Sequence, residues 1–521
     1  MNKRLIRIGL CMVIGLLFGS AVLAGSVYPL NTDVTLTYWM ELDQNVALVA
    51  KNMGDTPFGK ELEKRTGVKL KFIHPALGQT QEAFNLLLAS GELPDIIEYN
   101  WLAVPGGPNS IIKNGLIVTL NPLINQYAPN LKSFLKSHPS FDRMIKTDEG
   151  NYFVFPFIRG DQSLLISAGP MVRKDWLDEL GLKVPETIDD WYVMLKAFKE
   201  KKGVPMPLTV ENNPTQRLNY MFGGGFNSFN GFYVAKNKIH YGGIEPNRKL
   251  YLAAMNKWFT EGLIDPNFMV AARKNVDANI LSNKAGATYG SAGSGIGRYL
   301  DAMKGKDAKF NLVAAPFPAP AKGAKCHFAY AGQYFGGITG NAAISAKCKH
   351  PDLAARVLDY GYSPEGSLLY NFGIEGQTYT LVNGNPKMTE LVRKNPEGLS
   401  NTQVLAKYAR STYSGPFVQD KRYIEQYYEY PQQNDAVEQW QKNDYLQYML
   451  PPLTPTPDES TQLAKIMNEI NTYQDEMTVK FIMGTEPLKN FDQYVSVVQK
   501  MGIDRAIGLY QIALVRYNKR R

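Results

Sequence analysis

A glycine-rich stretch, GSAGSGIG (Gly290 to Gly297), holds the residues that come nearest to a catalytic motif. A nucleophile elbow needs a glycine two positions before and two positions after its serine, and neither Ser291 nor Ser294 has both. The stretch also lacks the lysine of a phosphate-binding loop. A tight turn that lets the backbone approach a ligand explains it equally well, as it does the similar FGGGFNSF (Phe222 to Phe229).

Aromatic and amide side chains are the chemistry that the sequence has in abundance. It contains 30 Tyr, 24 Phe and 6 Trp, many of them in turn-like segments such as AYAGQYFGG, ARSTYSGPFVQDKRY and EQYYEYP. Sugar rings have apolar faces that lie against aromatic planes, and their hydroxyls need Asn, Gln, Asp, Glu or Arg partners. The composition suits oligosaccharide binding, although a large Tyr-rich surface has the same composition. A glycoside hydrolase with two nearby carboxylates stays open as the enzyme alternative.

The sequence contains few residues that could form a metal site or a disulfide. The chain has five His and no paired Cys or His at ligand spacing, so neither a zinc site nor another cofactor is expected. Cys11 lies in the apolar start of the chain, which leaves Cys326 and Cys348. These two can form one disulfide outside the cytoplasm if their geometry permits it, and the sequence leaves that open.

The elements that must position this chemistry begin with an alternation of strands and helices. The first helix is capped by Thr56 and ends at Gly67, and the second helix ends at Gly91. Such a βαβαβ unit predicts parallel strands joined by right-handed crossovers. The three expected strands are Val34 to Met40, Val68 to Ile73 and Asp95 to Tyr99.

The carboxyl ends of these strands mark the expected ligand site, because the loops of an open parallel sheet leave a crevice there. That rule selects Trp39, Glu41, His74, Asn100 and Trp101. Two tryptophans and a carboxylate would form the rim of a small-molecule site. The alternative is that Trp39 and Trp101 are packing residues beneath a loop.

The remainder of the chain is predicted to be increasingly helical. Thr187 with Asp190, and Thr456 with Glu459, have the spacing of capping boxes at helix starts. The apolar stripes of these helices are expected to be core. Between them, APFPAPAKG (Ala315 to Gly323) is interpreted as a stiff crossing between lobes or, alternatively, a surface loop.

The amino-terminal segment has the features of an export signal. Three basic residues precede an apolar run from Ile8 to Phe18, and small residues follow up to Ala24. The run is shorter than the roughly 20 residues of a membrane-spanning helix, so cleavage near Ala24 and release are expected rather than a retained anchor. In VLAGS (Val22 to Ser26), Ser26 stands where a lipid-attachment site would have Cys.

Bulk composition suits a soluble globular protein of more than one domain. Hydrophobic residues make up 44% of the chain and charged residues 20%. The formal net charge of +9 is spread along the sequence, so nucleic-acid binding is not expected. The terminal YNKRR is interpreted as a solvated helix end.

The order of several long motifs resembles the extracellular solute-binding proteins of family 1, the carbohydrate receptors of bacterial ABC importers. The likeness is to the long members common in Gram-positive bacteria, and it covers nearly the whole mature chain. The motifs that carry it are TPFGKELEKRTGV, LLLASGELPDIIEYNW, GPMVRKDWLDELGLKVPETIDDWYVMLKAFK, VLDYGYSPEGSLLYNFGIEG and the C-terminal segment from INTYQDEMTVKF to IALVRYNKR.

The resemblance implies an α/β, two-lobe periplasmic-binding-protein-like fold of type II, with hinged lobes, parallel-rich central sheets and a helical C-terminal part. Residues 27–160 and about 325–380 would form the N-terminal lobe, and residues 161–324 and about 381–521 the C-terminal lobe. The lobes would close over a sugar and present it to two permease subunits in the membrane, with an ATPase behind them. A monomer is expected.

By position, the resemblance also implies which segments face the cleft. No catalytic residue or metal ligand is among them. The implied ligand-binding residues are Trp39, Glu41, Asn100, Trp101, Arg159, Asp161, Asn227, Tyr289, Gln333, Tyr334, Glu375 and Tyr413.

Two departures from the family pattern matter. Many long relatives insert a calcium loop after the helix that here ends AFKEKKG, whereas this chain passes directly to VPMPLT, so calcium is not expected there. Ser26 replaces the lipid-bearing Cys usual in Gram-positive relatives, which leaves retention at the cell surface unexplained. The sequence thus predicts a secreted oligosaccharide receptor, with a peptide-like solute or a glycoside hydrolase as alternatives.

Overall fold

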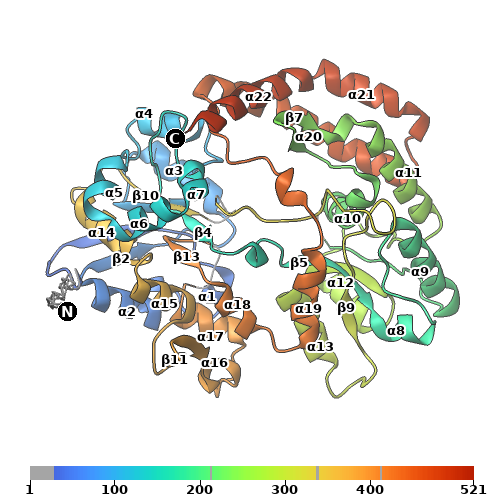
Figure 1. The fold of residues 1–521 in the computed structure, drawn as a ribbon, viewed down its shortest axis with the longest axis horizontal. Helices are drawn as coiled ribbons and strands as arrows, with labels where there is room; N and C mark the ends of the chain where they lie inside the picture. The colour runs from blue at the N-terminus through green and yellow to red at the C-terminus, as the bar shows by residue number, and fades with distance from the viewer. Residues whose placement is uncertain (1–27, 212–213, 336–339, 411–413, 521) are drawn as a thin grey trace, which may run out of the picture.

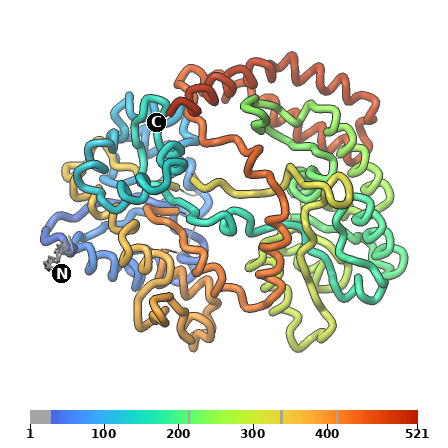
Figure 2. Tube along the Cα trace, viewed as in Figure 1, coloured from blue at the N-terminus to red at the C-terminus, as the bar shows by residue number. Residues whose placement is uncertain are grey.

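The computed structural model describes residues 28–211, 214–335, 340–410 and 414–520 of the chain. Two α/β lobes lie side by side and are joined by several crossing segments (Figure 1; Figure 2). Each lobe has its own large cluster of buried apolar side chains. The predicted leader lies outside the described residues.

A four-stranded sheet with the order β10-β3-β1-β2 forms the centre of the first lobe. Strand β1 pairs in parallel with both β2 and β3, and β10 joins β3 antiparallel. The predicted βαβαβ start is therefore confirmed. The bounds are β1 (Thr35–Trp39), α2 (Pro57–Thr66), β2 (Lys69–Ile73), α3 (Thr80–Ser90), β3 (Ile96–Tyr99) and β10 (Asn341–Ile344).

Local capping explains where the first of these helices begins and ends. The Thr56 side chain accepts a hydrogen bond from the Gly59 amide at 3.0 Å, which satisfies one of the free amides of the first turn. At the other end Gly67 adopts a left-handed conformation (φ 73°), with the Leu30 carbonyl oxygen only 2.4 Å from where a Cβ would lie. A side chain at this position would be both strained and blocked.

The second lobe is built differently from the prediction. Its sheet has the order β8-β5-β9, and both pairings are antiparallel. The expectation of parallel-rich sheets thus holds for the first lobe, whereas the three strands of this sheet are antiparallel and parallel pairing beside β8 occurs at the isolated bridges of Leu208 with Ile264 and Ala287. The bounds are β5 (Ala168–Arg173), α8 (Lys174–Glu179), α9 (Ile188–Lys201), α10 (Pro214–Phe222), β6 (Phe232–Ala235), β7 (Lys238–Tyr241), α11 (Pro246–Thr260), α12 (Arg273–Leu281), β8 (Ala287–Ser291), α13 (Arg298–Met303) and β9 (Leu312–Ala314).

The predicted lobe boundary near residue 381 also needs correction. Strand β13 pairs in parallel with β4, and both Ala406 and Phe417 belong to the apolar cluster of the first lobe. The chain therefore stays with the first lobe until about Tyr427, where α18 ends. The remaining bounds in and around that lobe are α1 (Gln44–Ala47), α4 (Gly107–Lys113), α5 (Asn121–Tyr127), α6 (Pro129–Ser137), α7 (Pro139–Met144), β4 (Phe157–Arg159), α14 (Pro351–Tyr360), α15 (Pro364–Phe372), β11 (Tyr379–Val382), β12 (Asn385–Met388), α16 (Glu390–Arg393), α17 (Asn401–Tyr408), β13 (Phe417–Gln419) and α18 (Lys421–Tyr427).

Within the described residues, three segments cross between the lobes before the chain reaches its C-terminal helices. The first leads from β4 to β5, and the second passes from Ala331 in the second cluster to Phe335 in the first. The third connects α18 to α19 (Pro431–Trp440), which packs against β9. The segment Ala315 to Gly323 is not a crossing, because the Ala319 amide donates to Glu186 O at 2.9 Å and Phe317 is buried in the second cluster.

A group of C-terminal helices spans both lobes along one edge, drawn in red at the top of Figure 1. Helix α20 begins beside α4 of the first lobe and contacts α11 of the second. The predicted capping box of Thr456 and Glu459 starts this helix, and Gly484 ends it. We call this group the terminal brace: α20 (Pro457–Met483), α21 (Phe491–Lys500) and α22 (Ile503–Lys519).

Both cysteines of the described residues are free thiols. Cys326 is buried in the apolar cluster of the second lobe, and Cys348 lies against that of the first. The disulfide that the sequence left open is therefore not formed. Within the described ranges, no helix combines the length and the apolar character needed to cross a membrane.

Candidate functional site

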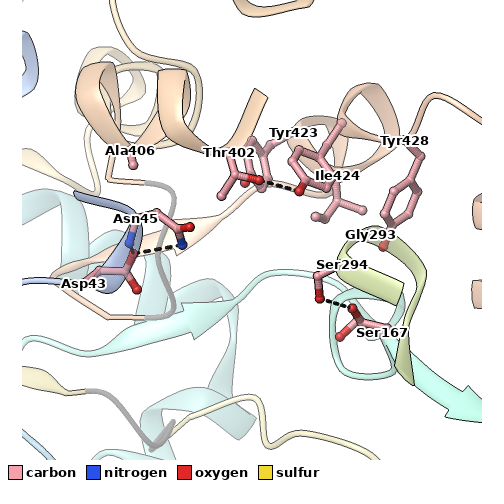
Figure 3. A pocket seen from close by; sticks show the side chains of 12 residues that line it. Asp43, Asn45, Ser167, Gly293, Ser294, Thr402, Ala406, Tyr423, Ile424 and Tyr428 are labelled. Carbon is pink, nitrogen blue, oxygen red and sulfur yellow. Dashed lines mark hydrogen bonds between the residues drawn. The ribbon is translucent and has the colours of Figure 1, made fainter. Parts of the chain in front are cut away.

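The space between the lobes contains three adjoining cavities. The first, which we call the central cavity, has a volume of about 250 Å³ and receives side chains from both lobes (Figure 3). Asp43 caps α1 of the first lobe and Asn45 lies in that helix, and Ser167, Ser291 and Ser294 come from the second lobe. Its other lining residues are Gly293, Thr402, Ala406, Tyr423, Ile424, Tyr427 and Tyr428.

The first-lobe side of the central cavity is held in place by a helix cap. The Asp43 carboxylate accepts hydrogen bonds from the Asn45 backbone amide at 2.8 Å and from its side-chain Nδ2 at 3.1 Å. This arrangement fixes the start of α1 and orients the Asn45 amide. A polar side chain with a defined direction therefore lies at this wall, which suits recognition of a ligand hydroxyl.

The second-lobe side is the glycine-rich turn between β8 and α13. Residues Ala292–Gly297 form a π-helical turn, and the Ser291 and Ser294 hydroxyls bond each other at 2.7 Å. A Cβ on Gly293 would lie 2.7 Å from Cε1 of Tyr427. The glycine thus allows Tyr427, at the end of the first lobe, to approach the backbone of the second lobe.

Aromatic rings of α18 line the third side. Tyr427 has ring centroids 6.2 Å from Tyr423 and 6.0 Å from Tyr428. The Tyr427 hydroxyl is hydrogen-bonded to Thr402 on α17. Tyr427 and Tyr428 belong to EQYYEYP and Tyr423 ends ARSTYSGPFVQDKRY, two of the aromatic segments that the sequence indicated for sugar contact.

A second cavity, the arginine cavity, shares Ser291 and Ser294 with the central one and has a volume of about 200 Å³. Tyr289 is 5% exposed there, and its hydroxyl has no hydrogen-bond partner among the described residues. Burial raises the pKa of Tyr289 well above 10, and the nearby Arg217 offsets this only in part. Its other lining residues are Ala168, Met171, Glu211, Arg217, Arg273, Val276, Gly290, Gly295 and Tyr299.

A third, outer cavity of about 360 Å³ continues from the central one past Tyr427. It lies between the glycine-rich turn and α17, and it includes Arg298 and Asp301 of α13. Arg298 is engaged by Asp277, with Nη1 to Oδ2 at 2.7 Å, and Tyr430 donates to Asp301 Oδ1 at 2.5 Å. The charged groups of this cavity are therefore largely occupied by protein partners.

The two tryptophans predicted to form the rim are core residues instead. Trp39 is 4% exposed and packs against Phe84 and Tyr99, with ring centroids 6.0 and 6.4 Å away. Trp101 is fully buried, and its indole Nε1 donates to Asn341 O at 2.9 Å. The packing alternative is therefore the one that the structure shows, because Phe84 of α3 covers the ends of these strands.

Other predicted residues from the first lobe lie near the cleft but outside the three cavities. Glu41 is half-buried two positions before Asp43, and the Asn100 Oδ1 is buried without a partner among the described residues. Asp161 accepts from the Ser163 amide at 2.9 Å and pairs with Lys421 at 3.3 Å, which shapes the first crossing. Arg159 lies at the end of β4, and its guanidinium occupies the space beside Gly332.

The remaining predicted residues are dispersed. Asn227 adopts a left-handed conformation (φ 50°) after a turn and lines none of the three cavities. Gln333 and Tyr334 line a separate cavity of about 180 Å³ beside the second crossing, and Glu375 is exposed. Tyr413 lies outside the described residues, so the structure brings only Tyr289 of the predicted set into the cleft cavities.

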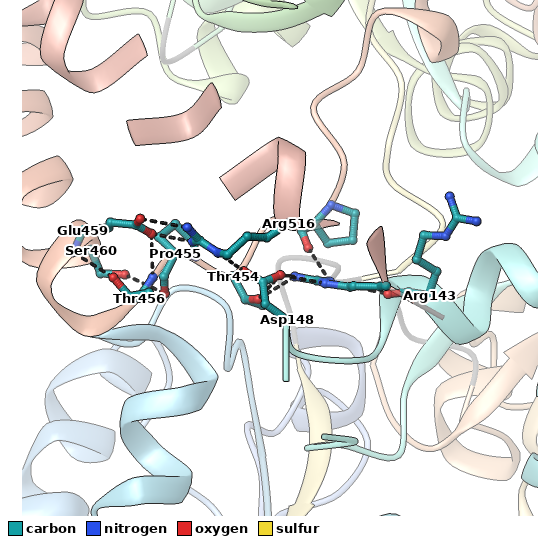
Figure 4. A network of polar contacts seen from close by, with 10 residues as sticks. Arg143, Asp148, Thr454, Pro455, Thr456, Glu459, Ser460 and Arg516 are labelled. Atoms are coloured by element: carbon teal, nitrogen blue, oxygen red, sulfur yellow. Dashed lines mark hydrogen bonds and ion pairs between the residues drawn. The ribbon is translucent and has the colours of Figure 1, made fainter. Parts of the chain in front are cut away.

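The opposite edge of the cleft is closed by polar contacts of the terminal brace (Figure 4). Asp148 of the first lobe accepts from Arg516 Nε at 2.6 Å and from Arg520 Nε and Nη2 at 2.8 and 2.6 Å. Arg516 also forms a bidentate pair with Glu459 at 2.8 and 2.5 Å. The Arg520 side chain is 1% exposed, so these charges are held in a desolvated network.

The described residues contain no group of three or more His, Cys, Asp or Glu side chains that could hold a metal ion. The cavities offer aromatic faces, hydroxyls, amides and arginines instead. Such a lining can bind a polar solute from two sides as the lobes enclose it. The fold and this cleft define a two-lobe binding protein of the periplasmic-binding-protein-like class.

Comparison with known proteins gives the same class. Residues 54–367 match the family described as bacterial extracellular solute-binding protein, and the chain belongs to that family. It is 32% identical over 182 residues to the fructooligosaccharide ABC transporter substrate-binding protein FusA of Streptococcus pneumoniae serotype 4 (strain ATCC BAA-334 / TIGR4), covering 34% of this chain and 33% of FusA. It is 27% identical over 373 residues to lipoprotein LipO of Bacillus subtilis (strain 168), covering 68% of this chain and 70% of LipO.

Among solved structures, the crystal structure of the alginate-binding protein AlgQ2 without calcium ion has a fold similar to that of this chain, with a TM-score of 0.75. The two sequences are 26% identical, and the match covers 94% of this chain and 99% of AlgQ2. The predicted family and two-lobe fold are confirmed. Members of this family are extracellular solute-binding proteins, so the chain is a receptor and not an enzyme.

Proposed function

We propose that this protein is the oligosaccharide receptor of an ABC importer and binds its ligand in the cleft between the lobes. The observation that carries this proposal is the central cavity, whose walls come from both lobes and combine tyrosine rings with hydroxyl and amide groups. Tyr427 and Tyr428 provide apolar planes for sugar faces. Asn45, Ser291 and Thr402 provide partners for sugar hydroxyls.

The printed names of relatives support a sugar ligand. FusA is a fructooligosaccharide-binding protein and AlgQ2 an alginate-binding protein. The role in import further implies two permease subunits in the membrane with an ATPase behind them, to which the closed receptor delivers its ligand. We also propose export with cleavage near Ala24 and, because Ser26 carries no lipid, release from the membrane.

A thermal-shift screen with defined plant and microbial oligosaccharides tests the proposal. A ligand that binds the native state adds about 2.7 kcal/mol of stability at a concentration of 100 Kd, so a binding sugar should raise the Tm measurably. Dipeptides and tripeptides, tested in parallel, should leave the Tm unchanged. If only peptides raise the Tm, or if no sugar in a broad panel does, the proposal is wrong.

A second measurement separates a receptor from a hydrolase. The best-binding oligosaccharide is incubated with the protein, and its chain length is followed by chromatography. The receptor proposal predicts that the oligosaccharide keeps its length even when the incubation lasts many times longer than the lifetime of the complex. The appearance of shortened products would contradict it.

A pair of variants tests whether the tyrosine wall contacts the ligand. Tyr428→Ala removes a ring from the central cavity and should weaken sugar binding about tenfold by calorimetry. Tyr473→Ala is the control, because Tyr473 lies on α20 of the terminal brace and lines none of the cavities. Equal affinities for the two variants would place the ligand elsewhere.

A further inference from the structure

The arginine cavity differs from the central cavity in its charge. Three charged side chains line it, Arg217, Arg273 and Glu211, so it carries one excess positive charge. By contrast, Asp43 is the charged side chain that lines the central cavity. The two cavities share Ser291 and Ser294, so one extended ligand can enter both.

The polar groups of the arginine cavity are only partly satisfied within the described residues. The Tyr289 hydroxyl and Nε of Arg217 are buried and have no partner there. Arg217 Nη2 contacts Glu211 Oε1 at 3.3 Å, which is long for a charge-assisted hydrogen bond. The Arg217 guanidinium lies 5.0 Å from the centre of the Tyr289 ring, which holds the guanidinium beside the hydroxyl.

Arg273, at the start of α12, adds an exposed second guanidinium. It donates to the Ser294 carbonyl on the glycine-rich turn, and its charge helps to lower the pKa of Asp277, whose carboxylate is paired with Arg298. Its remaining donors are thus available at the boundary between the two cavities. Two guanidinium groups, which can only donate, and a phenol hydroxyl that stays protonated face this space, and Glu211 is the carboxylate in the same lining.

We propose that the arginine cavity binds the carboxylate of a uronic acid residue, so that the ligand is an acidic oligosaccharide. The inference rests on the proposed function and names the substrate class. A carboxylate accepts in both lone-pair directions of each oxygen, so it can satisfy Arg217, Arg273 and Tyr289 together. A neutral sugar hydroxyl has one oxygen and would leave part of these donors unpaired.

The next sugar of such a ligand would lie in the central cavity. There Tyr427 and Tyr428 offer ring faces, and the lining carries no arginine. The arrangement therefore selects an oligosaccharide in which at least one residue is acidic and its neighbour presents an apolar face. The carboxylate fixes the register of the chain in the cleft.

Calorimetry with uronate oligosaccharides and their methyl esters tests this inference. The ester keeps every sugar hydroxyl, removes the charge and adds one methyl group. We expect the acid forms of galacturonate, mannuronate or guluronate di- to tetrasaccharides to bind at least about tenfold more tightly than their methyl esters. Binding of the acid should weaken as sodium chloride rises, whereas binding of the ester should not.

Variants assign the effect to the cavity. Arg273→Gln should lower the acid preference about tenfold, and Glu211→Gln should raise it, because the competing carboxylate is removed. Arg505→Gln is the control, since it removes the same charge from α22, where Arg505 contacts Gln462. Thermal unfolding of each variant checks that it is folded.

The outcomes separate this inference from the proposed function. If neutral oligosaccharides bind in the cleft and no acid form binds more tightly than its ester, the inference is overturned and the receptor role stands. If no saccharide of either kind binds, both are overturned. An acid preference that Arg273→Gln and Arg505→Gln reduce equally would reflect overall charge and would also overturn the inference.

Discussion

The cleft and the terminal brace use polar groups in opposite ways. In the brace, both oxygens of Asp148 and both of Glu459 accept hydrogen bonds from arginines. In the arginine cavity, the Tyr289 hydroxyl and Arg217 Nε are buried without partners among the described residues. Polar groups therefore have their hydrogen-bonding capacity filled at one edge of the molecule and partly unfilled at the other.

The free-energy cost of burying a polar atom without a hydrogen-bond partner explains why this difference between the two regions is informative. A buried polar atom without a partner costs about 1–3 kcal/mol, so such atoms are uncommon in a folded interior. A receptor can tolerate that cost where a ligand supplies the missing partner. The comparison thus indicates which polar groups stabilise the fold and which are reserved for binding, and substitutions in the two regions should have opposite consequences.

The largest effect is expected at Asp148. Asp148→Ala removes the shared acceptor of Arg516 and Arg520 and leaves the buried Arg520 without its carboxylate partner. Breaking one side of a buried ion pair costs about 3–5 kcal/mol, and we expect a loss of free energy of unfolding in that range. Chemical denaturation monitored by fluorescence measures it.

A matched control removes a carboxylate from the same group of helices. Asp504 is exposed in the first turn of α22 and forms no ion pair within the described residues. Asp504→Ala should cost less than about 1 kcal/mol, since only its interaction with the helix dipole is lost. A similar cost for both variants would show that the brace does not depend on its buried charges.

A second buried carboxylate, Asp359 on α14, sharpens the comparison because its partners are amides. It accepts from the Leu131 amide at 2.8 Å and from the Asn130 amide and Nδ2 at 3.2 and 2.7 Å, at the start of α6. Burial raises the pKa of Asp359 to about 6, against an ordinary value of 3.8, and these hydrogen bonds oppose the shift only in part. Without a paired arginine, the charge is costly to bury.

This raised pKa predicts the sign of a pH dependence. The folded protein holds a proton that the unfolded chain releases, so the stabilisation is complete below pH 3.8 and is lost as pH rises through about 6. The free energy of unfolding of the wild type minus that of Asp359→Asn should therefore fall by roughly 1–3 kcal/mol from pH 4 to 7. A difference that stays constant, or rises, would show that Asp359 is charged in the fold throughout.

The first lobe was predictable because its signals are local. Thr56, Gly67 and Gly91 mark helix ends in the sequence, and the alternating strands between them leave one βαβαβ order. The second sheet was not predictable in this way. Its strands β5, β8 and β9 are separated by long helical excursions, and nothing local in β5 specifies antiparallel neighbours.

The site was less predictable than the fold because two lobes build it. The glycine-rich turn and the tyrosines of EQYYEYP stood out by composition, and both line the central cavity. Asp43, Asn45 and Thr402 come from distant segments and have no sequence signal of their own. Trp39 was assigned to the rim because the strand-end rule does not reveal that Phe84 of α3 covers it.

The smallest effect on stability, and the sharpest contrast with Asp148, is expected at Tyr289. Tyr289→Phe removes a hydroxyl that has no partner among the described residues and keeps the ring that packs under Arg217. The free energy of unfolding should change by no more than about 0.5 kcal/mol, or rise slightly, because no hydrogen bond is lost and one buried polar atom disappears. Ligand affinity should nevertheless fall several-fold. Denaturation and calorimetry on the same preparation measure both, and a loss of stability above about 1 kcal/mol would mean that the hydroxyl supports the fold, which would remove the distinction between the two regions.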